Sequence, residues 1–572
     1  MKQAQSRIAA IAEHLKPTPD TSDVDNANKV FRSELSPISL LRRTCSLYPT
    51  RTAFVHGNNG GSAVSYSAFS ERVRRLARAL STSFGVGEGD RVAVLVPNTP
   101  CILEANFAVP LCLAQIVSIN TRLNQDEIDY ILTLSQPKVL FVDHELEHLT
   151  VNFKKCGVAH RVVVADLFGT KTAASDPYEQ LIAGADAAPW SSFPPLKSED
   201  DVISINFTSG TTGRPKGVMY HHRGAYLNSL CLALEMGMTS ESNFLWTLPM
   251  FHASGWCFPW AVCAVGATHT LIRKVDYDLI WHLFETANIT HYCGAPTVQL
   301  SIVNHKNARP LNRQMKTMVA AAPPSPTLLE GLLKIGITPF HVYGLTETYG
   351  PSTICAWQSE WRSLGYAEMA EKLSRQGQAF LASDEVQVWD EETGREVPAD
   401  GTTLGEVVFR GNLVMKGYLK DEKATRESFK GGVFHTGDVG VKHPDGYIEL
   451  RDRKKDIIIS GGENISTIEI EQAIVSHPAI FETCVVSAPD NQWGERPIAY
   501  VTLKKEISPS QHAAFEQELL KYLRTKIAGY KMPIRVHILV ELPKTSTGKI
   551  QKFVLRDQEW AKAGRVGGKK IN

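Results

Sequence analysis

Residues 208–217 read Thr-Ser-Gly-Thr-Thr-Gly-Arg-Pro-Lys-Gly, and this stretch decides the fold class that we expect. Its glycines let the backbone bend tightly or approach a ligand closely, and Arg214 and Lys216 add positive charge. Successive backbone N–H groups in such a turn form an anion-binding concavity. The preceding run 202–207, Val-Ile-Ser-Ile-Asn-Phe, predicts a strand that leads into the loop. We interpret 208–217 as a polyphosphate-binding loop rather than a polar surface turn.

This loop is not a Walker A motif, which requires Gly, any four residues and then Gly-Lys-Ser/Thr. Counted from Gly210, the position of the second glycine is occupied by Pro215, and Val218 follows Gly217. Nucleotide-binding proteins of the P-loop class are therefore disfavoured.

Eight further stretches follow along the chain, and most are rich in glycine, hydroxyl groups, aromatic rings or charged groups. They are Pro249-Met250-Phe251-His252-Ala253-Ser254-Gly255-Trp256, Gly294-Ala295-Pro296-Thr297, Ala320-Ala321-Ala322-Pro323-Pro324, Tyr343-Gly344-Leu345-Thr346-Glu347-Thr348, His435-Thr436-Gly437-Asp438, Arg451-Asp452-Arg453-Lys454-Lys455-Asp456, Ser460-Gly461-Gly462-Glu463-Asn464 and Pro543-Lys544-Thr545-Ser546-Thr547-Gly548-Lys549-Ile550. In this order, the series resembles the adenylate-forming superfamily of acyl-CoA synthetases, peptide-synthetase adenylation domains and firefly-type luciferases. The resemblance covers nearly the whole chain, and the alanines at 320–322 are a mild departure, because members more often have glycine there.

The resemblance implies an α/β fold with a large N-terminal domain of stacked β-sheets, flanking helices and a small barrel, followed by a small, mobile α/β C-terminal domain. A length of 572 residues agrees with more than one hydrophobic core. We expect a polar N-terminal arm at 1–33, the large AMP-binding domain at 34–453, a hinge at 454–456 and the small domain at 457–572. The charge run 451–456 alone would indicate a solvated surface, but Lys455 in it matches the hinge residue of the family.

The resemblance also assigns residues to the nucleotide. An aromatic ring such as Tyr343 suits a purine face, and Asp438 can accept hydrogen bonds from two vicinal ribose hydroxyls. A carboxylate beside phosphates requires a hard cation between them, so Glu347 and Thr211 are expected to hold Mg²⁺. The residues expected to contact ATP or AMP are Thr208, Ser209, Gly210, Thr211, Thr212, Gly213, Lys216, Ala321, Ala322, Pro323, Tyr343, Gly344, Asp438 and Arg453.

Catalytic roles are implied for Lys549, Thr346, Glu347 and His252. The alternatives are a surface lysine at 549 and an ordinary core histidine at 252. The acyl pocket is expected at His252, Trp256, Gly294 and Ala295, and the pantetheine arm of coenzyme A is expected at Gly461 and Gly462.

The function implied is an ATP-dependent carboxylic acid–CoA ligase. The carboxylate attacks the α-phosphate of Mg-ATP, acyl-adenylate forms, pyrophosphate leaves, and the thiol of coenzyme A then displaces AMP. Short- to medium-chain fatty acids are the expected substrates. The alternatives are an aromatic acid–CoA ligase, a stand-alone adenylation enzyme that loads a carrier protein, a luciferase-like oxidase and a non-catalytic nucleotide-binding protein.

Composition narrows the partners to small molecules. A net charge of +1 and 43% hydrophobic residues are ordinary for a globular protein and give no reason to expect nucleic acid. The ten cysteines include no C-x-x-C pair, which disfavours metal clusters and a disulfide framework. Residues 144–148, His-Glu-Leu-Glu-His, fit the H-E-x-x-H zinc pattern, but their charged surroundings favour a solvated helix.

The chain is expected to be cytoplasmic, as a monomer or a homodimer, with no integral membrane association. The stretch 105–121 lacks charge but contains Pro110 and Gln115, which favours a buried helix followed by a strand over a membrane span. The apolar run 8–11 is too short for a signal peptide, although a weak organellar presequence stays open. The C-terminal residues differ from the peroxisomal Ser-Lys-Leu signal.

Overall fold

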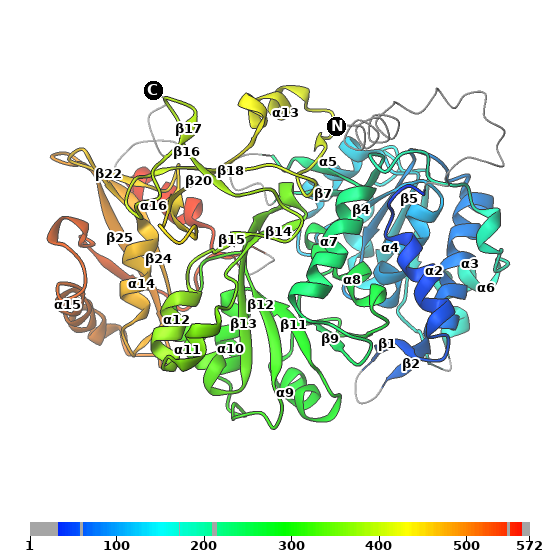
Figure 1. The fold of residues 1–572 in the computed structure, drawn as a ribbon, viewed down its shortest axis with the longest axis horizontal. Helices are drawn as coiled ribbons and strands as arrows, with labels where there is room; N and C mark the ends of the chain where they lie inside the picture. The colour runs from blue at the N-terminus through cyan, green and yellow to red at the C-terminus, as the bar shows by residue number, and fades with distance from the viewer. Residues whose placement is uncertain (1–32, 58–60, 171, 209–213, 546–548, 563–572) are drawn as a thin grey trace, which may run out of the picture.

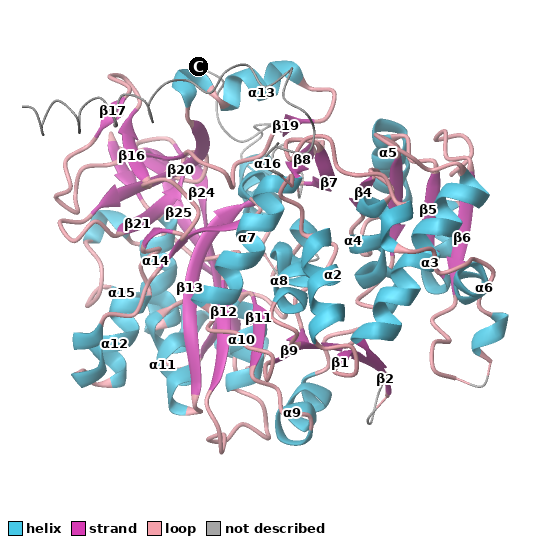
Figure 2. Cartoon of the chain, turned by 45° about the vertical axis from the view of Figure 1, so that its right-hand side comes forward, coloured by secondary structure: helices cyan, strands magenta, loops and turns pink. Residues whose placement is uncertain are grey.

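The computed structural model describes residues 33–57, 61–170, 172–208, 214–545 and 549–562. Within them, two large sheets and a smaller antiparallel sheet precede a fourth sheet near the C-terminus (Figures 1 and 2). The expectation of a mixed α/β fold with a large N-terminal and a smaller C-terminal domain is confirmed. No described helix is long and apolar enough to cross a membrane.

The seven-stranded sheet contains the strand that leads into the phosphate loop. Its central strands are parallel, with β8 and β19 added antiparallel at one edge. In spatial order it consists of β19 (Gly417–Tyr418), β8 (Gly217–His221), β7 (Val202–Phe207), β4 (Gln115–Ser118), β3 (Arg91–Leu95), β5 (Val139–Asp143) and β6 (His160–Val164). The strand predicted at 202–207 is thereby confirmed.

The nine-stranded sheet forms the second large layer. Its order is β15 (Gln378–Ala379), β14 (Gly350–Ile354), β13 (Ile337–Leu345), β12 (Met315–Val319), β11 (His291–Gly294), β9 (Asn243–Trp246), β10 (Thr268–Leu271), β1 (Thr52–His56) and β2 (Ser62–Ser65). The third sheet has an open strand order, so the expected small barrel stays a prediction. This sheet is a five-stranded antiparallel sheet of β17 (Arg395–Glu396), β16 (Gln387–Asp390), β18 (Gly405–Phe409), β20 (Phe434–Lys442) and β21 (Ile448–Arg453).

The fourth sheet lies beside the third and contains residues from 458 onward (Figure 1). Its strands are β22 (Ile458–Ser460), β23 (Glu463–Ile465), β24 (Ile480–Asp490), β25 (Gly494–Leu503) and β26 (Val536–Ile538). A hydrophobic cluster composed wholly of residues from 458 onward packs on it, which supports the proposed domain boundary at the hinge.

The helices pack on these sheets where the sequence gives them apolar faces. Helix α4 has a proline at its first position and is buried along its whole length, as expected for a helix between two layers. Ser65 caps α3, and Gly85 ends it in the left-handed conformation with φ 62°. The described helices are α2 (Ile38–Leu47), α3 (Tyr66–Phe84), α4 (Pro100–Leu111), α5 (Gln125–Ser135), α6 (Pro177–Ala183), α7 (His222–Glu235), α8 (Phe258–Ala264), α9 (Tyr277–Thr286), α10 (Pro296–Val303), α11 (Pro326–Lys334), α12 (Tyr366–Leu373), α13 (Glu422–Ser428), α14 (Thr467–Val475), α15 (His512–Leu523) and α16 (Lys552–Lys562).

Two local expectations have clear outcomes. The stretch 105–121 forms the end of α4 followed by β4, so the helix-plus-strand prediction is confirmed.

The composition of the stretch 167–197 suggests a surface excursion. This stretch also contains α6, where Tyr178 is buried and donates a hydrogen bond to the buried Glu104. Glu179 in the same helix pairs with Arg72 at 2.8 Å, so polar contacts to the core hold this segment.

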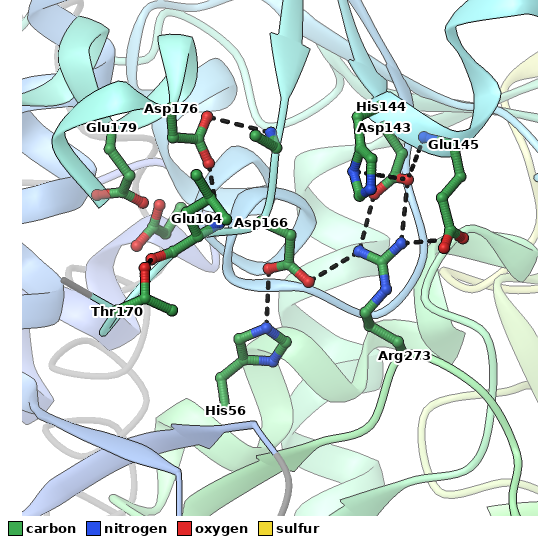
Figure 3. Close-up of polar contacts among 12 residues, drawn as sticks. His56, Glu104, Asp143, His144, Glu145, Asp166, Thr170, Asp176, Glu179 and Arg273 are labelled. Atoms are coloured by element: carbon green, nitrogen blue, oxygen red, sulfur yellow. Dashed lines mark hydrogen bonds and ion pairs between the residues drawn. The ribbon is translucent and has the colours of Figure 1, made fainter. Parts of the chain in front are cut away.

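A buried polar network joins the two large sheets (Figure 3). Arg273, two residues after β10, binds Asp143 at 2.9 and 3.0 Å and Asp166 at 2.8 Å. The ring of His56, at the end of β1, lies 2.8 Å from the other oxygen of Asp166. Burial alone would raise the pKa of the Asp166 carboxyl, but the contacts with His56 and Arg273 hold that pKa below its ordinary value. The network therefore fastens β1 and β10 to the ends of β5 and β6.

Candidate functional site

Two hydrogen bonds join the two ends of the predicted phosphate loop. The Thr208 N–H donates to the Lys216 carbonyl at 3.0 Å, and the Lys216 N–H donates to Thr208 Oγ1 at 3.1 Å. The ammonium of Lys216 lies 4.7 Å from the centre of the Tyr418 ring. The predicted ligands Ser209, Gly210, Thr211, Thr212 and Gly213 lie outside the described residues.

The residues predicted for adenine and ribose lie together. Tyr343, near the end of β13, donates a hydrogen bond to Asp438 Oδ2 at 2.7 Å. Arg453 Nε lies 3.2 Å from Asp438 Oδ1, because β20 and β21 pair these two residues in register. Burial, and next the Asp438 charge, raise the pKa of Tyr343 well above its ordinary value. At Gly344, an added Cβ would lie 1.7 Å from the Gly350 carbonyl oxygen, so only glycine fits there.

Glu347, in the short turn η7 (Thr346–Thr348), fits the metal-binding role predicted for it. Tyr418 donates a hydrogen bond to Glu347 Oε1 at 2.9 Å, and the backbone carbonyl of Thr346 accepts one from Tyr220. Burial raises the pKa of Glu347. Within the described part of the chain, its carboxylate forms no ion pair with a lysine, arginine or histidine. A partly buried carboxylate of this kind suits a hard cation such as Mg²⁺.

Lys549 lies at the end of a hairpin that the pairing of Lys544 with Ile550 closes. The Thr545 N–H donates to the Lys549 carbonyl at 2.7 Å, and the Lys549 N–H donates to Thr545 Oγ1 at 3.1 Å. The pKa of the partly buried Lys549 ammonium is lowered to about 7, first by desolvation and next by the Arg453 charge, while Asp438 acts in the opposite sense. The charges of Arg453 and Asp438, two of the predicted nucleotide-binding residues, therefore act on the predicted adenylation lysine.

His252 belongs to the same electrostatic environment. Its pKa is lowered to about 4, first by burial and next by the charge of Lys549. The ring is therefore neutral near pH 7. The charge of the predicted catalytic lysine thus acts on the predicted acyl-pocket residue, although the two lie 297 positions apart in the sequence.

Residues 253–257 form a left-handed turn that carries Trp256. All five have positive φ values, from 43° to 65°, and only one of them is glycine. A left-handed residue with a side chain costs about 1–2 kcal/mol, so the surroundings must hold this turn. Asn206 does so from β7: its Oδ1 accepts the Ser254 N–H at 2.7 Å, and its Nδ2 donates to Ser254 Oγ at 3.0 Å.

Trp256 is 5% exposed and lies against Gly350 in β14. A Cβ added to Gly350 would lie 3.1 Å from the Cβ of Trp256. Gly294, at the end of β11, is equally restricted, because an added Cβ would lie 3.1 Å from Val298 Cγ1. Ala295 follows it as the N-cap of α10.

The predicted adenine turn contains a strained residue. Ala321 has a φ of 75°, a conformation that favours glycine, and this explains why alanine is a departure from the family pattern there. Ala322 is exposed and Pro323 is partly buried.

The predicted coenzyme A residues lie in an exposed turn. Gly461 and Gly462 form the exposed turn between β22 and β23, with φ values of 61° and 90°. The Gly461 N–H donates to the Trp493 carbonyl at 2.8 Å. The predicted hinge residue Lys455 is partly buried, and its carbonyl accepts a hydrogen bond from Arg556 at 3.4 Å.

The H-E-x-x-H pattern does not have the geometry that a zinc protease requires. Residues His144–Thr150 form a 3-10 helix with about three residues per turn, so His144 and His148 do not share a face. His144 lies 3.6 Å from Asp143 instead.

Sequence reasoning did not identify Tyr418 and Asn206 as parts of this region. For Asn206 a signal was present, because a polar amide inside the apolar run 202–207 must find buried hydrogen-bond partners. For Tyr418 we find no sequence signal other than its aromatic character.

Comparisons with known proteins agree with this arrangement. The AMP-binding enzyme family matches residues 41–419, and the AMP-binding enzyme C-terminal domain matches residues 469–549. The acetate/butyrate–CoA ligase AAE7 of Arabidopsis thaliana is 41% identical over 93% of this chain and 96% of its own length. The acetate–CoA ligase CCL3 of Humulus lupulus is 41% identical over 96% of this chain and 98% of its own length.

Solved structures show the same fold. ATP-bound MatB from Rhodopseudomonas palustris superposes with a TM-score of 0.78 at 26% identity, over 91% of this chain and 98% of that one. O-succinylbenzoate coenzyme A synthetase from Bacillus subtilis, in complex with ATP and a magnesium ion, gives 0.75 at 26% identity, over 90% of this chain and 98% of that one. The chain therefore belongs to the AMP-binding enzyme family and is an AMP-forming acid–thiol ligase.

Proposed function

We propose that the enzyme converts short- to medium-chain carboxylic acids into their coenzyme A thioesters, with ATP and Mg²⁺ as co-substrate and cofactor. The observation that carries this proposal is the ion pair of Asp438 with Arg453, two residues whose charges also act on Lys549. Relatives named as acetate, butyrate and 2-methylpropanoate ligases support a small aliphatic acid.

The proposed mechanism needs no side-chain nucleophile. Asp438 and Tyr343 orient the ribose and adenine, and the phosphate loop orients the triphosphate. Lys549 neutralises the charge that gathers as the carboxylate meets the α-phosphate. The neutral His252 ring lies where the acid is expected, and so it adds no charge of its own to that side. Magnesium held at Glu347 would supply charge neutralisation for the phosphates.

Two half-reactions place different demands on the chain. Adenylation needs the Lys549 ammonium close to Asp438, whose charge acts on it. Thioester formation needs the pantetheine thiol at the carbonyl of the acyl-adenylate. We propose that the segment from residue 457 onward rotates at 454–456 between the two steps and brings Gly461 and Gly462 toward the thiol.

The direct test is a panel of acids assayed for pyrophosphate release and thioester formation. The panel should contain acetate, butyrate, 2-methylpropanoate, hexanoate, octanoate, benzoate and cinnamate, each with ATP and free coenzyme A. Thioester formation with the short aliphatic acids is the expected result. A preference for benzoate or cinnamate would favour an aromatic acid ligase, and pyrophosphate release without consumption of coenzyme A would favour carrier-protein loading.

Trp256→Gly should shift the preference toward longer acids. The indole lies against Gly350, so its removal opens space on the expected pocket wall. Each extra methylene then accommodated is worth about 1–3 kcal/mol of discrimination. Because residue 256 has a φ of 52°, glycine fits the backbone there without strain.

The measurement is kcat/KM along the acid series for the wild type and the variant. Trp260→Phe, a change in the neighbouring helix α8 rather than at the turn, is a suitable control for general effects of losing an indole. An unchanged chain-length profile in folded Trp256→Gly enzyme would remove Trp256 from the acyl pocket.

A further inference from the structure

A buried polar contact spans the predicted hinge. Asp452, at 3% exposure, lies in β21 just before residues 454–456. Thr467, fully buried, begins α14 eleven residues after 456, beyond β22 and β23. Asp452 Oδ2 accepts hydrogen bonds from the Thr467 N–H at 2.6 Å and from Thr467 Oγ1 at 2.7 Å. The hydroxyl of the preceding Ser466 donates to the Arg451 carbonyl.

Asp452 and Thr467 belong to parts of the fold that lie on opposite sides of the predicted hinge. Asp452 lies opposite Val439 where β21 pairs with β20, the strand that contains Asp438. Thr467 begins a helix whose Ile470 and Ile474 lie in the hydrophobic cluster formed by residues from 458 onward. We expect a rotation at 454–456 to move Thr467 relative to Asp452 and to break the contact.

Thr467 also forms a hydrogen bond with a residue next to the hairpin of Lys549. Lys552, three residues after Lys549, donates from Nζ to Thr467 Oγ1 at 2.5 Å and pairs with Glu471 at 2.8 Å. The Thr467 hydroxyl thus donates to Asp452 on one side of the hinge and accepts from Lys552 on the other. Lys552 is the first residue of α16, which directly follows the hairpin.

We propose that Asp452 and Thr467 are positioning residues that hold the C-terminal segment in the orientation required for adenylation. The inference rests on the proposed function, because it assumes that the segment adopts a second orientation for thioester formation. Neither residue touches the reacting atoms. They act by setting the fraction of molecules in which the C-terminal segment holds Lys549 in the orientation for adenylation.

The expected signature is an effect on one half-reaction only. Asp452→Asn keeps the size of the side chain, and Thr467→Val removes only the hydroxyl. Each variant should lower the rate of acyl-adenylate formation from acid and ATP by about tenfold, since a lost charge-assisted hydrogen bond is on the order of tenfold in an equilibrium. Conversion of supplied acyl-adenylate and coenzyme A should be unchanged or faster, because the other orientation becomes more populated.

Glu469→Gln provides the matched control. Glu469 lies in the same helix and pairs with Lys531 at 2.7 Å, but both residues lie on the same side of the hinge. This variant also removes one carboxylate charge and leaves the contact of Asp452 with Thr467 in place. It should show the wild-type ratio of the two half-reaction rates.

Hydrogen–deuterium exchange gives a readout that does not depend on activity. In the wild type, the Thr467 amide should exchange slowly because Asp452 accepts its hydrogen bond. In Asp452→Asn, the peptide that contains residue 467 should exchange faster, while peptides of β24 and β25 keep their protection. That protection shows that the C-terminal sheet is still folded.

Equal losses in both half-reactions for Asp452→Asn, or unchanged exchange at residue 467 together with wild-type adenylation, would overturn the proposal. A failure of the proposed function is distinguishable from these results. In that case the wild type itself would form no acyl-adenylate with any acid of the panel, and the exchange experiment would still report on the contact.

Discussion

Lys549→Ala should nearly abolish the formation of acyl-adenylate from acid and ATP, and it should leave the conversion of supplied acyl-adenylate to thioester largely intact. The ammonium lies in the electrostatic environment of Asp438, Arg453 and His252, where the α-phosphate of a bound nucleotide is expected. Removing a positioned charge of this kind lowers a rate on the order of a hundredfold or more. The second half-reaction creates no new phosphate charge, because AMP leaves already formed.

Separate assays of the two half-reactions test this expectation. Pyrophosphate release reports the first step, and thioester formation from chemically prepared acyl-adenylate reports the second. Equal loss of both steps in a folded variant would contradict the rotation of the C-terminal segment. Loss of neither would mean that Lys549 is an ordinary surface residue.

Because the pKa of Lys549 is lowered, we expect the rate of acyl-adenylate formation to depend on pH near neutrality. Its value of about 7 in the free enzyme means that the required cation is present below that pH and is lost as the pH rises through it. We expect kcat/KM for ATP in the first step to decline above about pH 7. Bound triphosphate favours the charged form, so kcat should decline only at higher pH.

Lys549→Arg is the matched variant for the pH profile. A guanidinium stays charged across the whole range, so kcat/KM for ATP should lose its decline near pH 7, even if the maximal rate is lower. A decline at the same pH in Lys549→Arg would assign the titration to a different group.

Arg273→Met should destabilise the enzyme strongly. It removes the cation that binds Asp143 at 1% and Asp166 at 8% side-chain exposure, and it leaves both carboxylates buried between the two large sheets. Removing one partner of a buried ion pair typically costs about 3–5 kcal/mol. For a domain of this size, that is on the order of 5 °C in the midpoint of thermal unfolding.

Calorimetry with a surface control measures this effect. Arg426→Met removes an arginine that is 74% exposed and lies 3.5 Å from Glu422, which is 89% exposed, so we expect a change below about 0.5 kcal/mol. Arg273→Lys keeps the charge but not the forked geometry. Its midpoint of thermal unfolding should lie between those of Arg273→Met and Arg426→Met. Equal midpoints for Arg273→Met and Arg426→Met would show that the network does not fasten the sheets.

The same network predicts how the loss of stability in Arg273→Met depends on pH. The pKa of Asp166 is lowered in the folded state, so its contribution to stability is present above the ordinary carboxyl pKa and is lost as the pH falls through the folded value. A protonated Asp166 no longer needs the charge of Arg273. The difference in midpoint between wild type and Arg273→Met should therefore be largest near neutrality and should shrink in acid.

The sequence by itself determined the elements whose patterns are local. The apolar run 202–207 became β7, and the run 105–121 became the end of α4 followed by β4, because hydrophobic periodicity and turn residues act over a few positions. The order of short motifs along the chain was also sufficient to indicate the family. Roles for individual residues such as Lys549 and Asp438 stay predictions until the half-reactions are measured.

Only the tertiary structure decided which distant residues meet. Asp452 approaches Thr467, Asn206 holds the turn of Trp256, and Arg273 joins Asp143 to Asp166. Only Asn206, a polar amide in an apolar run, stands out among these side chains in the sequence. The H-E-x-x-H pattern, which looks distinctive, forms a 3-10 helix without the required geometry. The physical reason is that a polar side chain has no preferred partner until burial removes water, and which groups then share a buried space is set by sheet register and domain packing.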